Sequence, residues 1–351
     1  MTKNKRHTWE SMYIELTSKC NLNCAYCYNN CSNNTIDYLP VDVVKNLIDK
    51  AHILQINDIS FSGGEPLLHP NFMEIFDYYT SVFGKGPTLI TNASLLTDNL
   101  LEKIVSTKTL LQLTIDGDTA DIHGLTRDFS NFSNNIHVLD ILQNKYHYTG
   151  IFGRMNLTFL NYKRIIPTAK LLIDKGVHNL TFALISTAGR GANFNNSHNI
   201  YESDILEIIK HDLDYLTNLY TDTRFRYLDL ANCLGCDFNS NKEHHINLRI
   251  RYDGIIFPCQ AFCSDCYKLG NCLTTDLTDA SFISIYDQWI ENALSKKENA
   301  INCENCFCHT FCRGGCLAHI IDNEDRKIFN AACIMRKNKY KDLLLKQNKR
   351  I

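Results

Sequence analysis

The chain has 351 residues, of which 44% are hydrophobic, and a formal net charge of −2 at pH 7. This length suggests roughly two domains with a sizeable buried core. The small net charge predicts no nucleic-acid partner and no anionic-membrane partner. The residues after Met1 lack the apolar region of a signal peptide, and no uninterrupted apolar run reaches about 18 residues. We therefore expect a cytoplasmic protein, in which 16 cysteines favour metal or redox chemistry over disulfides.

Apolar runs with the length of strands alternate with amphipathic segments over roughly the first 200 residues. The predicted strands are Met12–Leu16, Asp58–Ser62, Pro87–Thr91, Leu111–Ile115, Arg154–Phe159 and Asn179–Leu184. Helical spacing of apolar residues predicts helices over Val41–Leu54, Phe72–Phe83, Ile136–Leu142 and Ile165–Ile173. This alternation predicts parallel strands with covering helices. Six units are fewer than the eight of a closed barrel, so we predict an α/β fold with an open (β/α)6 partial TIM barrel.

Three cysteines follow the first predicted strand with the spacing C-x3-C-x2-C. They are Cys20, Cys24 and Cys27, and the aromatic Tyr26 precedes the last of them. A loop of this length can hold three thiolates around one [4Fe–4S] cluster, which normally takes four, so one iron is left open. An open iron implies a ligand that is not protein.

The turn Gly63-Gly64-Glu65-Pro66 follows the second predicted strand. Together with the cysteine loop and its Tyr26, it resembles the radical S-adenosylmethionine (SAM) superfamily, whose fold is the open partial barrel. The resemblance implies that SAM chelates the open iron and is cleaved by an electron from the cluster to a 5′-deoxyadenosyl radical. It also implies that the backbone of both glycines meets the SAM ammonium and that Glu65 sets local charge. Taken alone, the sequence Gly-Gly-Glu-Pro is more typical of an ordinary turn than of a ligand-binding site.

A second segment, Leu113–Arg127, resembles the part of this family that holds the carboxylate and ribose of SAM. The resemblance gives those roles to Thr114 and Arg127. An arginine suits a carboxylate because its planar fork donates two parallel hydrogen bonds, although a surface-loop arginine is the alternative. We interpret Asp116 as a turn former. Gly189-Arg190-Gly191 resembles the family's cap over the adenosine.

These candidate ligand-binding motifs all come after predicted strands. Their first residues are Cys20, Gly63, Asn92, Asp116 and Gly189. Ligand sites of α/β proteins lie at the carboxyl ends of parallel strands. The sequence therefore predicts a single site on one rim of the barrel.

The organisation changes after about residue 225, where the alternation stops and 12 of the 16 cysteines are found. The pattern G-x4-C at Gly254 and Cys259, followed by C-x2-C-x5-C-x3-C and a final cysteine, resembles the SPASM domain of radical SAM enzymes. Asp253-Gly254 is a predicted hairpin turn. One departure is that the first cysteine lies farther from the glycine than usual. We predict a barrel over 8–225, a SPASM domain with a β-hairpin and short helices over 226–340, and a basic tail over 341–351.

The SPASM resemblance implies two auxiliary [4Fe–4S] clusters, which gives three clusters in all. The implied ligands of the cluster nearer the barrel are Cys233, Cys236, Cys259 and Cys316. Those of the distal cluster are Cys303, Cys306, Cys312 and Cys333. Zinc is the competing interpretation, since C-x2-C pairs can build tetrahedral sites. The remaining cysteines are Cys31, Cys263, Cys266, Cys272 and Cys308, of which 263, 266 and 272 are candidates for a third zinc site.

The segments Cys259–Phe262 and Tyr267–Asn271 resemble SPASM enzymes that modify ribosomally made peptides. We therefore predict a peptide maturase that installs a thioether or carbon–carbon cross-link or inverts a stereocentre, with Cys308 as first candidate for a hydrogen-donating catalytic thiol. A reduced ferredoxin or flavodoxin is the expected electron donor. Only nineteen residues precede Cys20, so leader-peptide binding is expected to use a separate protein, the barrel itself, or nothing.

Two other functions compete with this prediction. Anaerobic sulfatase-maturing enzymes share the architecture, but they carry an aspartate where this chain has Gln260. A zinc-stabilised, cysteine-rich scaffold without SAM chemistry is the alternative from another class. Metal analysis after anaerobic reconstitution separates the scaffold from the enzymes.

Overall fold

The computed structural model describes residues 6–197, 200–228, 243–300, 305–308 and 316–321, together with positions 330, 333, 334, 336, 337 and 341. Its strands are β1 (Arg6–Thr17), β2 (Asp58–Gly63), β3 (Thr88–Thr91), β4 (Leu110–Thr114), β5 (Ile151–Leu157), β6 (Asn179–Leu184), β7 (Arg224–Leu228), β8 (Glu243–Ile250), β9 (Ile255–Phe257) and β10 (Gly270–Asn271). They form one sheet in the order β10-β9-β8-β1-β2-β3-β4-β5-β6-β7. From β8 to β7 neighbouring strands are parallel, whereas β8, β9 and β10 pair antiparallel.

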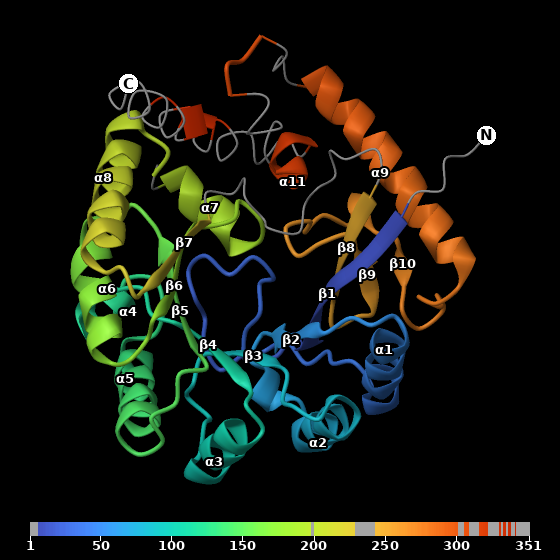
Figure 1. Ribbon diagram of the computed structural model, residues 1–351, viewed down its shortest axis with the longest axis horizontal. Helices are drawn as coiled ribbons and strands as arrows, with labels where there is room; N and C mark the ends of the chain where they lie inside the picture. Colours follow the sequence, from blue (N-terminus) through green and yellow to red (C-terminus); the bar gives the residue numbers. More distant parts are fainter. Residues whose placement is uncertain are drawn as a thin grey trace.

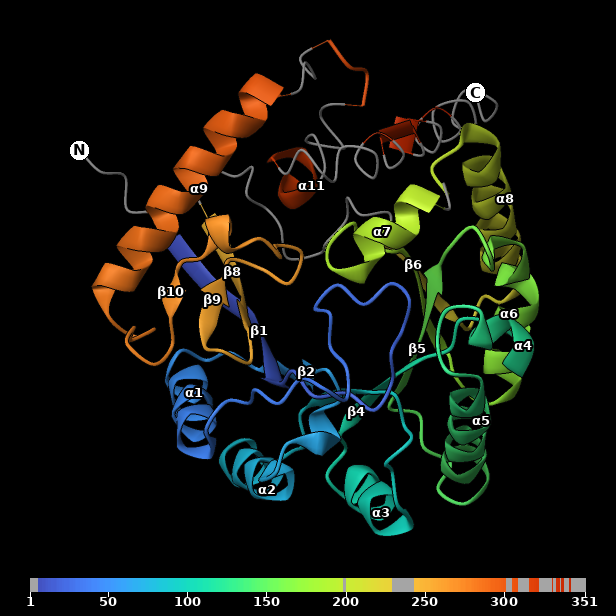
Figure 2. The same ribbon diagram turned by 180° about the vertical axis from the view of Figure 1, so that it is seen from behind.

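The described helices lie around this curved sheet. They are α1 (Val41–Ile53), α2 (Phe72–Phe83), α3 (Asp98–Ser106), α4 (Ala120–Gly124), α5 (Phe129–Asn144), α6 (Ile165–Asp174), α7 (Arg190–Ser197), α8 (Ser203–Leu219), α9 (Ala280–Ala300) and α11 (Leu317–Ile321). Short 3-10 turns are η1 (Pro66–Leu68), η2 (Tyr162–Arg164) and η3 (Asp265–Tyr267). Figures 1 and 2 show α1, α2, α3, α5, α6 and α8 around the outside, and the loop that follows β1 inside the curve.

The core lies between the helices and the sheet. Along β1, alternate residues Met12, Ile14 and Leu16 are fully buried, as expected for a strand whose side chains alternate between two faces. Helix α1 buries Val44, Leu47, Ile48 and Ala51, which recur at helical spacing on one face. Each large apolar side chain buried in this way contributes roughly 1.5–3 kcal/mol to stability.

The predicted parallel sheet is confirmed, and all six predicted strands are present, β6 with its predicted ends and the other five with shifted ends. The structure adds two parallel strands that the sequence analysis missed, β7 next to β6 and β8 next to β1. Both were missed because charged or imidazole side chains interrupt the apolar pattern, as in Arg224 and Arg226 of β7 or His244 and His245 of β8. Because β8 joins the barrel sheet, the domain boundary near residue 225 stays a prediction.

The predicted hairpin turn is confirmed. Strands β8 and β9 pair antiparallel, with Ile250 opposite Ile256, and Gly254 has φ +85°. This positive φ suits glycine, which has no Cβ to clash. Cys259 follows two residues after the end of β9.

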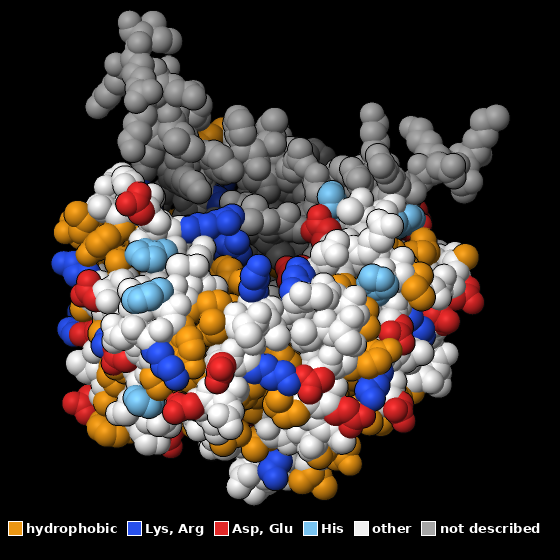
Figure 3. All heavy atoms as spheres, turned by 60° about the horizontal axis from the view of Figure 1, so that its bottom comes forward, with side chains coloured by type: hydrophobic (Ala, Val, Ile, Leu, Met, Phe, Trp, Pro, Cys, Tyr) orange, Lys and Arg blue, Asp and Glu red, His pale blue; other side chains and the backbone are white. Residues whose placement is uncertain are grey.

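The surface agrees with the small net charge. Figure 3 shows acidic and basic side chains interspersed over one face, with several basic side chains gathered beside the grey atoms. Among the described residues, the helices are too short or too polar to cross a membrane.

Candidate active site

The cysteine loop between β1 and α1 lies inside the curve of the sheet. Cys20 is buried, whereas Cys24 and Cys27 are half-buried, and Cys31 is buried beside them. A hydrogen bond from the Cys31 thiol lowers the pKa of Cys27 to about 6, and burial raises the pKa of Cys20 to about 12. Since the thiolate is the metal-binding form, the loop holds one cysteine that ionises readily without metal.

Zinc is the competing interpretation for the cysteines of this chain. In the part of the chain that the structure describes, no three Cys, His, Asp or Glu side chains are grouped to hold one metal ion. A structural zinc would need its four ligands around one point, whereas each cysteine of a cubane site binds a different iron. The described residues therefore give single-zinc sites no support.

The Gly-Gly-Glu turn after β2 packs against the base of the cysteine loop. Gly63 has φ +136°, and a Cβ there would lie 2.4 Å from the carbonyl oxygen of Thr17. A Cβ on Gly64 would lie 2.3 Å from the carbonyl oxygen of Lys19. The amides of Gly64 and Glu65 donate to those same two oxygens, at 2.7 and 2.8 Å. Both glycines therefore allow a close backbone contact that fixes where the cysteine loop begins.

Glu65 lies fully buried beneath this turn. Its Oε1 accepts from Thr91 Oγ1 at 2.7 Å and its Oε2 accepts from the Asn92 amide at 2.8 Å. Burial is the main cause that raises the pKa of Glu65 to about 7. Pro66 follows as the first residue of η1 and is buried. The carboxylate therefore ties the end of β2 to the end of β3.

Tyr26 is the centre of a buried polar group. Its phenol donates to the Asp116 carboxylate and accepts from Arg127 Nη1 at 3.1 Å and from Asn156 Nδ2 at 3.0 Å. Asp116 also accepts from the Asn156 amide at 2.8 Å. The sequence analysis missed Asn156 and interpreted Asp116 only as a turn former. In the structure Asp116 is fully buried and connects the cysteine loop to β4 and β5.

Further buried side chains extend the hydrogen-bonded network around Tyr26 along the rim. His123 Nδ1 accepts from the Asp116 amide at 3.2 Å, so its Nε2 is the protonated nitrogen and donates to Asn131 Oδ1 at 3.2 Å. Asn131 in turn donates to the carbonyl oxygen of Asn92 at 2.6 Å. Burial lowers the pKa of His123 and favours this neutral form. The rim from β2 to β5 is thus held by one hydrogen-bonded network.

Arg127 carries the feature that best fits an anionic ligand. One nitrogen of its guanidinium binds the Tyr26 phenol, but its Nε is buried and has no hydrogen-bond partner among the described residues. A buried unpaired donor is costly, and the carboxylate of SAM would satisfy it. Thr114, the last residue of β4, is buried nearby on the same rim. The SAM-binding roles of Thr114 and Arg127 stay predictions.

The segment Gly189–Gly191 contacts the cysteine loop directly. Gly189 has φ +57°, and a Cβ there would lie 2.5 Å from the carbonyl oxygen of Cys27. The Arg190 amide donates to that oxygen at 2.9 Å, while its Nε and Nη2 donate to the carbonyls of Cys24 and Cys31 at 2.8 and 2.9 Å. The predicted role over the adenosine stays a prediction. The structure shows in addition that Arg190 binds three backbone carbonyls of the cysteine loop, and we call these three hydrogen bonds the Arg190 clamp.

We expect Arg190→Lys to weaken retention of the barrel cluster, because lysine cannot reach two carbonyls with a planar fork. Losing one hydrogen bond to a charged group costs about 1.5–3 kcal/mol, so iron should be released to a chelator about tenfold faster. The measurement is the rate of iron release after anaerobic reconstitution. Arg224→Lys, on the exposed side of β7, is the matched control. Equal rates in both variants would show that the clamp is dispensable.

The structure describes only some of the predicted ligands of the auxiliary clusters. Cys259 and Cys316 are buried, whereas Cys306 and Cys333 are half-buried. The other predicted ligands lie outside the described residues; they are Cys233, Cys236, Cys303 and Cys312. Among the remaining cysteines, Cys308 is buried and Cys266 is exposed. The auxiliary ligand sets stay predictions.

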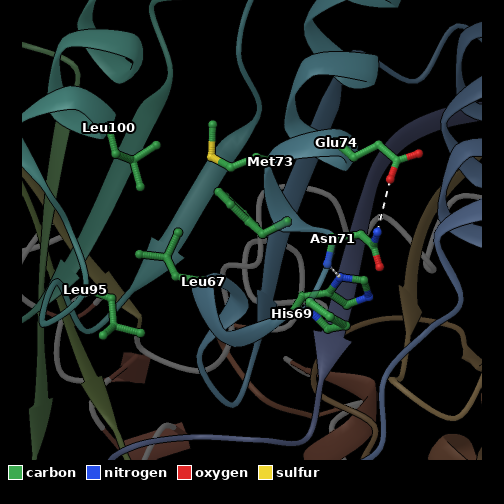
Figure 4. Close-up of a pocket in the computed structure, with 9 residues that line it drawn as sticks. Leu67, His69, Asn71, Met73, Glu74, Leu95 and Leu100 are labelled. Atoms are coloured by element: carbon green, nitrogen blue, oxygen red, sulfur yellow. Dashed lines mark hydrogen bonds between the residues drawn. The ribbon is translucent and has the colours of Figure 1, made fainter.

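A cavity of about 380 Å³ lies beside the Gly-Gly-Glu turn, on the side of η1 and α2. Figure 4 shows Leu67, Met73, Leu95 and Leu100 on its apolar side and His69, Asn71 and Glu74 on its polar side. None of the predicted SAM-binding residues is among the residues that line it. This cavity is therefore separate from the network around Tyr26.

The model of the radical SAM superfamily matches residues 14–195, slightly more than half of the chain. The match contains the cysteine loop, the Gly-Gly-Glu turn and Arg127. The chain belongs to the radical SAM superfamily. Membership assigns SAM and a SAM-binding iron–sulfur cluster to this protein, and it argues against a zinc scaffold without SAM chemistry.

Two curated relatives align with most of this radical SAM chain. Mycofactocin maturase MftC from Mycobacterium tuberculosis is 24% identical over 326 residues, which cover 89% of this chain and 78% of the relative. The antilisterial bacteriocin subtilosin biosynthesis protein AlbA from Bacillus subtilis is 25% identical over 312 residues, which cover 86% and 66%.

Two solved structures share the fold. SuiB from Streptococcus suis, bound to S-adenosylmethionine, has a TM-score of 0.69 at 18% identity and covers 89% of this chain and 74% of its own. The enzyme anSMEcpe with bound AdoMet has a TM-score of 0.67 at 19% identity and covers 95% of each chain. These likenesses show that the chain shares the partial-barrel fold of these structures.

Proposed function

We propose that this protein is a radical SAM/SPASM maturase that modifies a ribosomally made peptide. Support comes from MftC and AlbA, which are named for maturation and bacteriocin biosynthesis, and from SuiB, whose fold is shared and which has been solved with the precursor peptide SuiA. The SAM-binding part of the proposal rests on the buried, unpaired Nε of Arg127 next to Tyr26 in the cysteine loop, and the peptide part rests on these relatives.

Cys20, Cys24 and Cys27 would hold the barrel cluster, and SAM bound there would supply a 5′-deoxyadenosyl radical. The chain's own residues prepare that site. Arg127 offers its free Nε to the SAM carboxylate, and the Tyr26 phenol holds the guanidinium in place. Gly63 and Gly64 fix the start of the cysteine loop through their contacts with Thr17 and Lys19.

The proposal includes two auxiliary [4Fe–4S] clusters in the segment 226–340. Cys259 and Cys316, both buried, would belong to the cluster near the barrel together with Cys233 and Cys236. The distal cluster would use Cys303, Cys306, Cys312 and Cys333. An auxiliary cluster would accept an electron or bind a substrate thiolate. A ferredoxin or flavodoxin would reduce the barrel cluster, in the cytoplasm.

Cross-linking is the reaction we favour over epimerisation. An epimerase needs a thiol that returns hydrogen to an α-carbon radical, whereas a cross-linking enzyme disposes of an electron instead. The candidate thiols Cys308 and Cys31 are both buried, and buried thiols are commonly inert. Sulfatase maturation is not favoured, because the aligned curated relatives are named for other pathways and Gln260 replaces the expected aspartate.

The test requires a short precursor peptide, sought among the genes beside this one, which is incubated with the reconstituted enzyme in deuterated water. We expect a product two mass units lighter than the peptide, formed by the parent and by the single alanine variants at Cys31, Cys263, Cys266, Cys272 and Cys308. Mass spectrometry of the peptide gives the result. Deuterium at an α-carbon in the parent product, lost in one variant, would replace cross-linking by epimerisation and name the donor.

A further inference from the structure

A buried ion pair lies where β8 joins β1. Arg249 of β8 and Glu15 of β1 each have side chains with 0% exposure. The guanidinium donates to both carboxylate oxygens, from Nε to Oε1 at 2.9 Å and from Nη2 to Oε2 at 3.2 Å. A bidentate pair of this kind fixes orientation as well as distance.

The same guanidinium reaches the cysteine loop. Its Nη2 donates to Asn29 Oδ1 at 2.6 Å, two residues after Cys27. It also lies over the ring of Tyr28, 5.2 Å from the centroid, within the range of a cation–π contact. The Tyr28 phenol donates to Glu15 Oε1 at 2.8 Å. The position of the residues that follow Cys27 is therefore set by the ion pair.

On its other side, Arg249 reaches the loop that follows Cys259. Its Nη1 donates to the carbonyl oxygen of Phe262 at 2.8 Å and lies 3.6 Å from Cys263 Sγ. The guanidinium is also 5.0 Å from the ring centroid of Phe257, two residues before Cys259. One side chain thus touches both loops that carry predicted cluster ligands.

Stability alone does not explain this arrangement. Burying two charges carries a desolvation cost, and replacing a buried pair by apolar residues of similar volume is often neutral or stabilising. An apolar pair would not hold Asn29 and the Phe262 carbonyl at fixed positions. The distinctive property of Arg249 is that its planar fork contacts three separate segments at once.

We propose that Arg249 is a positioning residue that couples the loop after Cys259 to the SAM-binding cysteine loop. A change on the Cys259 side would move the guanidinium, and through Asn29 and Tyr28 it would alter how tightly the cysteine loop holds SAM. The presence of an auxiliary cluster at Cys259 rests on the proposed function, but the coupling between the two loops does not require it.

The test compares Cys259→Ser in three backgrounds after anaerobic reconstitution, with SAM affinity and the electron paramagnetic resonance spectrum of the barrel cluster as readouts. In the parent we expect Cys259→Ser to weaken SAM binding about fivefold or more and to change the spectrum. In the Glu15→Met, Arg249→Met background, which leaves no unpaired charge, the same substitution should have no further effect. Arg249→Lys is the second test background should the double variant fail to fold.

The matched control background is Arg251→Met with Asp253→Asn. Arg251 lies two residues from Arg249 and pairs with Asp253 and Asp265 at the surface, at 2.7 and 2.8 Å. Cys259→Ser should weaken SAM binding there as in the parent. An equal loss of affinity in every background, or no loss in the parent, would overturn the coupling. The iron content of each variant is measured separately. If Cys259→Ser keeps the iron content of the parent, Cys259 is not an auxiliary-cluster ligand, but the SAM affinities of the backgrounds can still be compared.

Discussion

Replacing Cys20, Cys24 and Cys27 together with alanine is expected to abolish cleavage of SAM to 5′-deoxyadenosine. The variant loses every protein ligand of the barrel cluster, so SAM has no open iron to bind. With three cubanes in the parent, iron should fall from about twelve to about eight atoms per chain, at four per cubane. The measurements are chromatography of the nucleoside product and an iron assay after anaerobic reconstitution.

Cys266→Ala is the control for this triple variant, because Cys266 is exposed and lies outside the predicted ligand set. It should retain both SAM cleavage and the full iron content. Cleavage that persists in the triple variant would rule out the assignment of these three cysteines. A parent that binds only about four irons would keep the barrel assignment and remove the auxiliary clusters.

Arg127→Lys is expected to weaken SAM binding by about tenfold or more while the iron content stays unchanged. Lysine keeps the charge but lacks the fork and the Nε donor, and a hydrogen bond to a charged group contributes about 1.5–3 kcal/mol. Anaerobic titration with SAM gives the affinity. Because Arg127 Nη1 also binds the Tyr26 phenol, Tyr26→Phe should give a smaller loss by loosening the guanidinium.

Arg164→Lys is the control for this comparison, since Arg164 forms a partly exposed pair with Asp118 away from the Tyr26 phenol. Its SAM affinity should equal that of the parent. If Arg127→Lys also binds SAM as the parent does, Arg127 takes no part in SAM binding, and the role that the family resemblance implies for it is wrong.

The sequence predicted the parallel sheet because apolar runs and helical stripes are local signals. It missed β7 and β8, whose polar side chains hide the strand pattern and whose pairing partners are distant in the chain. His245, for example, lies opposite Thr8 of β1. Such pairing depends on neighbours that no local window contains.

The site was predicted through its motifs and missed where no motif exists. Asp116 looked like a turn former in Asp-Gly, because its partner Tyr26 lies 90 positions away. Asn156 carries no signal of its own and meets Tyr26 across 130 positions. The sequence predicted that Gly63 and Gly64 matter for the site. The close contact that requires glycine at these positions is with the backbone of Thr17 and Lys19. Residue spacing cannot reveal contacts of this kind.

The pairing of β8 with β1 has a consequence for how this protein can be divided. Strand β1 is 12 residues long and carries the cysteine loop at its end. From Arg6 to Ile14 one of its sides is covered by β8. A fragment that ends near residue 225 would leave that row of amides and carbonyls open, and a long uncovered edge of this kind invites pairing between chains. The two halves of the molecule therefore protect each other from self-association, and neither is a natural unit for expression by itself.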